Sequence, residues 1–198
     1  MYITVAGFKG GVGKTTTAVH LAAILHERAP TLLVDGDPNH SATVWARAGR
    51  LPFLVTDERQ AMRQVRHYTH VVIDTKARPD EDDLTALAAG CDLLIVPTTV
   101  EALALDALLL LVRTLTTMHA PFRVLLTMVP PRPTRDVEEA RALLAEANVP
   151  TFSGAIRRLV AFQKASLHGV IARDAPDPRA AEAFDDYAAI AREIQIPA

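Results

Sequence analysis

Residues 7–16 read GFKGGVGKTT and lie between an apolar run and a helical pattern. Glycine reaches backbone angles that are closed to other residues, so Gly10, Gly11 and Gly13 allow consecutive N–H groups to turn toward one anion. The helix N-terminus that follows adds further N–H donors near the same point. This stretch therefore predicts a strand, a phosphate-binding loop and a helix, in that order along the chain.

The end of the loop carries the side chains that a phosphate site needs. In the motif G-x-x-x-x-G-K-[ST], the lysine binds the β- and γ-phosphates and the hydroxyl binds Mg²⁺. Lys14 and Thr15 occupy these two positions, although Phe8 stands where the ordinary motif has its first glycine. The residues predicted to contact the nucleotide here are Gly10, Gly11, Val12, Gly13, Lys14, Thr15 and Thr16.

A second lysine, Lys9, precedes the glycines. Residues 9–15, KGGVGKT, resemble the signature Lys-Gly-Gly-x-Gly-Lys-Thr of the ParA/MinD family of partition and positioning ATPases. In that family the first lysine reaches across a dimer to the phosphates of the partner's nucleotide. The resemblance implies ATP and Mg²⁺ as cofactors, a homodimer that forms on ATP binding, and Lys9 and Lys14 as catalytic residues. A solvated surface side chain is the alternative for Lys9.

The rest of the chain alternates short apolar runs with helical patterns over 198 residues, of which 49% are apolar and 22% charged. The runs are nearly continuous in Ile, Val and Leu, which is typical of strands covered by helices on both faces. We predict an α/β fold of the P-loop NTPase type, a doubly wound, mostly parallel sheet flanked by helices, in a single domain over 1–198. Strands are expected at about 2–7, 31–35, 70–74, 92–97 and 122–128, and helices at about 14–28, 57–67, 80–89, 100–118, 134–147, 157–168 and 179–194. The last helix carries an apolar stripe, for which core packing is expected, made of Ala180, Ala183, Phe184, Tyr187, Ala191 and Ile194.

Two carboxylates follow the predicted strand over about 31–35. This strand ends in Asp35-Gly36-Asp37-Pro38, at the carboxyl edge where open α/β sheets bind their ligands. The ParA/MinD motif reads Asp-x-Asp-Pro-Gln, and its second aspartate orients the attacking water. The resemblance therefore implies a catalytic role for Asp37 and a supporting, Mg²⁺-linked role for Asp35, with Asn39 in place of the usual glutamine. The alternative is that these residues only form a turn.

A third carboxylate, Asp74, ends the predicted strand over about 70–74. This is the usual setting of the aspartate that holds Mg²⁺ through water. The family normally continues with Asp-Thr-Pro, whereas this chain has Lys76 after Thr75. Lys76 lies where the γ-phosphate is sensed, so it either contacts the nucleotide or points to solvent. The acidic run over 80–83 opens a helix and is expected to cap it.

A proline-rich loop follows the predicted strand over about 122–128. In related ATPases this neighbourhood holds the adenine ring. A rigid loop with apolar Met128 can pack on a base while backbone groups read the edge of the base. Met128, Pro130 and Pro131 are therefore the residues expected to contact adenine.

The net charge of −2 arises from 21 basic and 23 acidic residues and conceals an uneven distribution. Residues 154–173 contain basic side chains and no acid, whereas residues 174–198 are mainly acidic. The basic segment resembles the region of ParA proteins that grips the DNA backbone, and such contacts are independent of sequence. The resemblance implies DNA contacts by Arg157, Arg158, Lys164 and Arg173. An ordinary solvated helix face is the alternative.

These features predict a small ParA-like ATPase without an N-terminal helix-turn-helix. Family resemblance implies an ATP-driven dimer that binds DNA non-specifically and positions plasmid, chromosome or protein cargo with a ParB-like or cargo-adaptor partner. We expect a cytoplasmic, nucleoid-associated protein, because no apolar run is long enough to span a membrane and 193–198 lacks a basic amphipathic helix. Two alternatives remain, a ligase-like metabolic enzyme and a poorly hydrolysing ATP-gated DNA clamp. An iron–sulfur reductase is disfavoured because Cys91 is the only cysteine.

Overall fold

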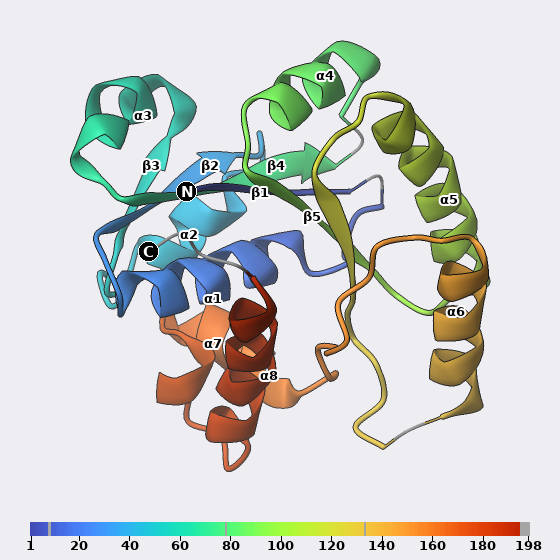
Figure 1. Ribbon diagram of the computed structural model, residues 1–198. Coiled ribbons are helices and arrows are strands. Elements are labelled where there is room, and N and C mark those ends of the chain that lie inside the picture. Colours follow the sequence, from blue (N-terminus) through green and yellow to red (C-terminus); the bar gives the residue numbers. More distant parts are fainter. Residues whose placement is uncertain (8, 78, 133, 195–198) are drawn as a thin grey trace.

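The computed structural model describes residues 1–7, 9–77, 79–132 and 134–194, so Phe8, Arg78, Pro133 and the C-terminal residues 195–198 lie outside the described chain. Within it, six parallel strands form one sheet in the order β3-β2-β4-β1-β5-β6, with helices on both faces (Figure 1). The strands are β1 (Tyr2–Gly7), β2 (Thr31–Gly36), β3 (Leu54–Asp57), β4 (His70–Ala77), β5 (Leu93–Thr98) and β6 (Phe122–Leu126). The helices are α1 (Lys14–His26), α2 (Ser41–Ala46), α3 (Glu58–Gln64), α4 (Glu81–Ala89), α5 (Ala102–Thr117), α6 (Arg135–Glu146), α7 (Val160–His168) and α8 (Ala180–Glu193). The predicted doubly wound α/β fold is confirmed.

Alternate residues of the central strands enter two different cores. In β5, Ile95 packs with α1, α7 and α8, whereas Leu94 and Val96 pack with α4, α5 and α6 on the opposite face. All three side chains are at most 1% exposed. Because both faces are covered, the strands contain apolar residues at successive positions, which is why their sequences do not alternate with polar ones.

The C-terminal helices are attached to α1 through a group of buried rings. His20 on α1 stacks on Tyr187 of α8 with 4.9 Å between ring centroids, and Trp45 and Phe162 meet His20 edge-on. The Nε2 of His20 accepts the backbone N–H of Ala172, and burial lowers the pKa of His20 to about 4. His20 is therefore neutral at physiological pH. The stripe predicted on α8 is buried here, which confirms core packing.

Two short elements escaped the sequence patterns. The helix α2 and the edge strand β3 lie between β2 and α3, where no element was expected. Both expose an apolar side chain, Val44 on α2 and Leu54 on β3, and both are too short to show a clear hydrophobic period. The helix expected from residue 157 begins at Val160, because Arg157 still forms a bridge to Val129.

The carboxyl ends of β1, β2 and β4 bring the predicted site together. Asp35 and Asp74 are register neighbours on β2 and β4, and the glycine loop leaves β1 between β4 and β5. Three segments that are far apart in sequence therefore meet at one edge of the sheet. None of the described helices has the length and apolar character of a membrane span.

Candidate functional site

The glycine loop over residues 9–13 leads from β1 into α1. Gly11 has φ of 76° and Gly13 has φ of 86°, angles that only glycine adopts without strain. Gly13 is the N-cap of α1, and its carbonyl accepts the N–H of Thr17. The loop thus delivers backbone donors to a helix N-terminus, where an anion is stabilised.

A cavity of about 760 Å³ opens beside this loop, within the range of small-molecule sites. It is bordered by the glycine loop and the start of α1, by Asp37 and Asn39 after β2, by Thr127 and Met128 after β6, and by residues from 156 to 166. Of the residues predicted to bind nucleotide, the cavity touches Gly10, Gly11, Gly13, Lys14, Thr15, Thr16 and Met128. Val12 is buried behind the loop, and neither Pro130 nor Pro131 reaches the described wall.

Lys14 begins α1 and carries a desolvated cation. Its side chain belongs to the cavity wall, yet the residue is only 7% exposed. Burial lowers the pKa of Lys14, whereas the nearby carboxylates of Asp74 and Asp37 act in the opposite direction. A buried ammonium group needs anionic partners, and phosphate oxygens entering the cavity would supply them.

Thr15 and Asp74 form the part of the site that suits Mg²⁺. The Thr15 hydroxyl donates to Asp74 Oδ2 at 2.6 Å, while Asp74 Oδ1 is buried without a hydrogen-bond partner. Burial raises the pKa of Asp74 to about 7, and the charges of Asp35 and Asp37 add to the rise. An orphaned carboxylate oxygen beside a hydroxyl fits a hard cation. In the described residues no cluster of three or more His, Cys, Asp or Glu could hold a metal alone, so water and phosphate oxygens must complete the shell.

The two aspartates at the carboxyl end of β2, Asp35 within the strand and Asp37 just after it, have different environments. Asp35 Oδ2 accepts both the N–H and the hydroxyl of Thr43 on α2, each at 2.7 Å. Asp37 lies on the cavity wall, where its Oδ1 accepts the N–H of Asn39 at 2.8 Å and the Asn39 side chain at 2.9 Å. Asp37 is thus the carboxylate held next to the cavity, while Asp35 ties α2 to the sheet. Sequence reasoning missed Thr43, because α2 itself was not expected.

Lys9 does not border the cavity that its own loop helps to form. Its side chain is 40% exposed and makes an ion pair with Glu101, just before α5, with 2.8 Å between Nζ and Oε2. The hydrogen bond and the charge of Lys9 lower the pKa of Glu101. The amine lies on the outer surface of the loop, where a second molecule can approach it.

Lys76 forms an ion pair with Asp83 at 2.5 Å and a longer one with Asp80 at 3.8 Å. Asp80 and Asp83 also form a reciprocal capping box at the start of α4, which confirms the predicted capping role of the acidic run. Lys76 is therefore directed to the N-terminal end of α4. Sequence reasoning left open a contact with the nucleotide or a side chain in solvent, and it did not foresee these carboxylate partners.

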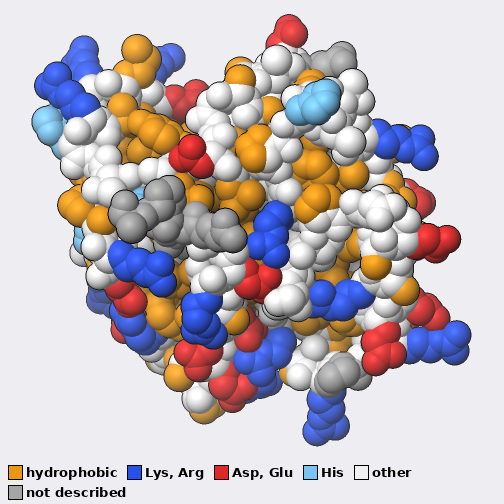
Figure 2. Space-filling model, in the orientation of Figure 1, with side chains coloured by type: hydrophobic (Ala, Val, Ile, Leu, Met, Phe, Trp, Pro, Cys, Tyr) orange, Lys and Arg blue, Asp and Glu red, His pale blue; other side chains and the backbone are white. Residues whose placement is uncertain are grey.

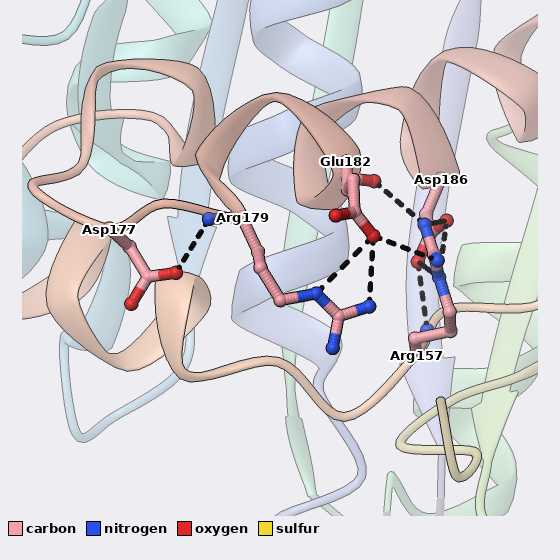
Figure 3. A network of polar contacts seen from close by, with 5 residues as sticks. All are labelled: Arg157, Asp177, Arg179, Glu182 and Asp186. Atoms are coloured by element: carbon pink, nitrogen blue, oxygen red, sulfur yellow. Dashed lines mark hydrogen bonds and ion pairs between the residues drawn. The ribbon is translucent and has the colours of Figure 1, made fainter. Parts of the chain in front are cut away.

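The four basic residues expected to contact DNA differ in whether a carboxylate of the same chain already binds them. Arg157 donates to Asp186 and Glu182 of α8, and Arg179 shares Glu182 (Figure 3). The acidic C-terminal segment folds back on the basic one, and Figure 2 shows acidic and basic side chains interspersed over the lower part of the molecule, where α7 and α8 lie.

Two further members of this group are also neutralised. Lys164 pairs with Asp177 at 3.0 Å, and Arg173 pairs with Glu27 at 2.6 Å. Arg158 has no ion pair within 4.0 Å among the described residues, although its charge helps to lower the pKa of Glu101, and it borders the cavity. The charge available for an external phosphate is therefore smaller than the sequence suggests.

Comparison with known proteins agrees with this geometry. Residues 3–171 match the family model described as the CobQ/CobB/MinD/ParA nucleotide binding domain. The chain belongs to this family. A relative from Gloeobacter kilaueensis, named maintenance of carboxysome distribution protein A, is 38% identical over 200 residues that cover 97% of this chain and 93% of the relative. The resemblance to ParA/MinD proteins is confirmed.

Solved members of the family share the fold. The ATP complex of a Cyanothece McdA variant superposes with a TM-score of 0.75 at 16% identity and covers 100% of this chain and 98% of its own. The septum site-determining protein MinD complexed with Mg-ADP, from Pyrococcus horikoshii OT3, gives a TM-score of 0.70 at 19% identity, with 98% and 95% covered. At such identities the likeness concerns the fold alone.

Proposed function

We propose that this protein is a positioning ATPase that binds Mg-ATP, dimerises around it, associates with DNA and distributes a cargo. The observation that carries this proposal is the placement of Lys9. This signature lysine lies outside the cavity of its own chain and on the outer surface of the glycine loop. A lysine in that position serves a nucleotide only when a second copy of the chain presents one.

The residues of the cavity account for binding of the nucleotide. The N–H groups of the glycine loop and Lys14 bind the phosphates, and Thr15 with Asp74 holds Mg²⁺, partly through water. The ATP in the McdA complex and the Mg-ADP in the MinD complex support this choice of ligand. Met128 and the chain from Ile156 to Leu159 surround the remaining space, where we place adenine.

Hydrolysis requires a water aligned with the γ-phosphate and stabilisation of the charge that develops there. Asp37 is the carboxylate on the cavity wall that orients the water, and Asn39 fixes its Oδ1. Lys14 from one chain and Lys9 from the other stabilise the charge on the transferring phosphoryl group. Asp35 acts indirectly, through its contacts with Thr43 and the Asp37 backbone.

We expect Lys9→Ala to prevent dimerisation while leaving nucleotide affinity within about threefold of wild type, because Lys9 does not touch its own cavity. Light scattering after size exclusion, with Mg²⁺ and a non-hydrolysable ATP analogue, measures the assembly. Lys164→Ala is the matched control, since Lys164 is also half-exposed and paired with a carboxylate, and it should dimerise normally. A wild-type protein that stays monomeric with the analogue would contradict the proposal, as would a fully dimeric Lys9→Ala variant.

The cargo and the surface on which it moves follow from the relatives and from the remaining charges. The 38% identical relative is named for carboxysome distribution, so we favour a large protein cargo, recruited through an adaptor that plays the part of ParB. DNA of the nucleoid would be the surface that carries the dimer. Of the four basic residues, Arg158 is the one free to meet a phosphate directly, and Arg157, Lys164 and Arg173 contribute after exchange of their carboxylate partners.

We expect Arg158→Ala to weaken binding of duplex DNA by the ATP-bound protein and to reduce the slope of log affinity against log salt by about one per protomer. Arg173→Ala should change this slope less, because Glu27 already neutralises Arg173. Fluorescence anisotropy with a labelled random duplex measures both variants over a range of salt concentrations. An unchanged DNA affinity, or an equal loss of ATP affinity in Arg158→Ala, would show that this arginine does not serve DNA.

A further inference from the structure

Thr127, immediately after β6 and on the cavity wall, is hydrogen-bonded to the glycine loop. The residue is 2% exposed, and its hydroxyl donates to the carbonyl of Val12 at 2.8 Å. A second carbonyl, that of Thr98 on β5, lies 3.0 Å from the same hydroxyl. Thr127 thus connects the ends of two strands to the loop, although 115 positions separate it from Val12.

Thr127 donates its single hydroxyl proton to the carbonyl of Val12. A threonine hydroxyl donates one hydrogen bond, so it satisfies one of the two carbonyls at a time. The Thr98 carbonyl already receives the backbone N–H of Thr127 at 2.8 Å. The Val12 carbonyl is also the nearer of the two acceptors. The hydroxyl is therefore available to Val12.

This bond sets the direction of the next peptide N–H. In a planar trans peptide the C=O of Val12 and the N–H of Gly13 point in opposite directions. Because the Val12 carbonyl points to the Thr127 hydroxyl, the Gly13 N–H points away from that hydroxyl. Gly13 has φ of 86°, and a Cβ placed on it would lie 4.0 Å from Thr127 Cβ, so the threonine lies next to this glycine.

We propose that Thr127 is a positioning residue for phosphate binding, which fixes the Val12–Gly13 peptide with its N–H toward the β-phosphate. The inference rests on the proposed binding of ATP at this loop and adds a residue that the loop motif does not contain. Thr127 acts through the backbone of Gly13. A free Val12 carbonyl would let this peptide rotate and remove one charge-assisted donor from the site.

We expect Thr127→Val, which keeps the shape and removes the hydroxyl, to weaken ADP and inorganic pyrophosphate about ten- to a hundredfold. AMP, which lacks a β-phosphate, should bind as it does to wild type. Thr127→Ser should restore the affinity for ADP, because it restores the donor. Isothermal titration with these three ligands measures the difference. Thr98→Val is the matched control, since that buried hydroxyl bonds to the Thr99 carbonyl and not to the loop.

Hydrogen–deuterium exchange without nucleotide separates this inference from the proposed function. Thr127→Val should exchange faster over residues 10–14, while Thr98→Val and Thr127→Ser should match wild type. Thr127→Ala serves in place of the valine variant if the latter does not fold. Wild-type ADP affinity and loop exchange in the variants without the hydroxyl would overturn the inference, as would equal losses for AMP and ADP. A wild-type protein that binds no ADP would refute the proposed function, and the exchange measurement would still decide the role of Thr127.

Discussion

Asp74→Asn should raise the free energy of unfolding of the metal-free, nucleotide-free protein at pH 8 by about 4 kcal/mol, at about 1.4 kcal/mol per pKa unit. Asp74 is fully buried, and its pKa is raised from 3.8 to about 7. The folded protein therefore binds the Asp74 proton more tightly than the unfolded chain does. Wild-type stability falls as pH rises from about 4 to about 7, when the carboxylate must ionise in the folded state. Asparagine keeps the shape of the side chain and lacks this ionisation.

Urea unfolding at pH 4 and pH 8, in the presence of a chelator, measures this effect. The gain should be small at pH 4, where Asp74 is protonated in the folded state and only about half ionised in the unfolded chain, and should reach its full size at pH 8. Asp106→Asn on α5 is the control, because it makes the same change at an exposed position. An equal gain at both pH values would refute the explanation. The same variant should lose the Mg²⁺ dependence of ATP binding. The carboxylate that lowers the stability of the empty protein would then be the one that holds the metal.

Asp37→Ala should slow ATP hydrolysis by at least about a hundredfold while ATP still binds. Asp37 borders the cavity through its carboxylate, and its removal leaves the glycine loop and Lys14 in place. Single-turnover hydrolysis and equilibrium binding of ATP separate the two effects. The loss should appear in the rate of the chemical step and not in the affinity.

Asn39→Ala is the companion variant for this prediction. Asn39 gives Asp37 one side-chain hydrogen bond, at 2.9 Å, and its backbone N–H bond to Asp37 would survive the substitution. We therefore expect a smaller loss of rate, about tenfold, from a less well oriented carboxylate. If Asp37→Ala hydrolysed ATP at the wild-type rate, another group would have to align the water. If it lost ATP binding as well, Asp37 would be a binding residue.

Much of the fold was predictable from local patterns. Helices cover both faces of the sheet, so its buried strands need apolar side chains at successive positions. Such continuous apolar runs are visible in the sequence, and they predicted β1, β2, β4, β5 and β6. The glycine loop was predictable for a different reason, since positive φ at Gly11 and Gly13 restricts those positions to glycine. The elements α2 and β3 were not predictable, because six and four residues are too few to show a period.

The parts of the site that depend on long-range contacts were beyond the sequence. The positive charge of 154–173 looked available, but Arg157 meets Glu182 and Asp186 only once α8 folds against it. Thr127 is separated from the loop by most of the chain, and no spacing rule connects it to Val12. What the sequence lacked in each case was the identity of a neighbour that is distant along the chain.

The ion pair between Lys9 and Glu101 gives the isolated subunit a ready substitute for the phosphate that Lys9 would meet in a dimer. Assembly would then replace the Glu101 carboxylate with a phosphate as the partner of Lys9, so the ammonium group would have a counter-charge in both states. A switch built on such an exchange would have a small energy difference between its two states, as the proposed cycle of assembly and separation requires. A stronger pair with Glu101 of the same chain would hold the protein in the monomeric state. A stronger contact with the partner's phosphate would hold it in the dimeric state.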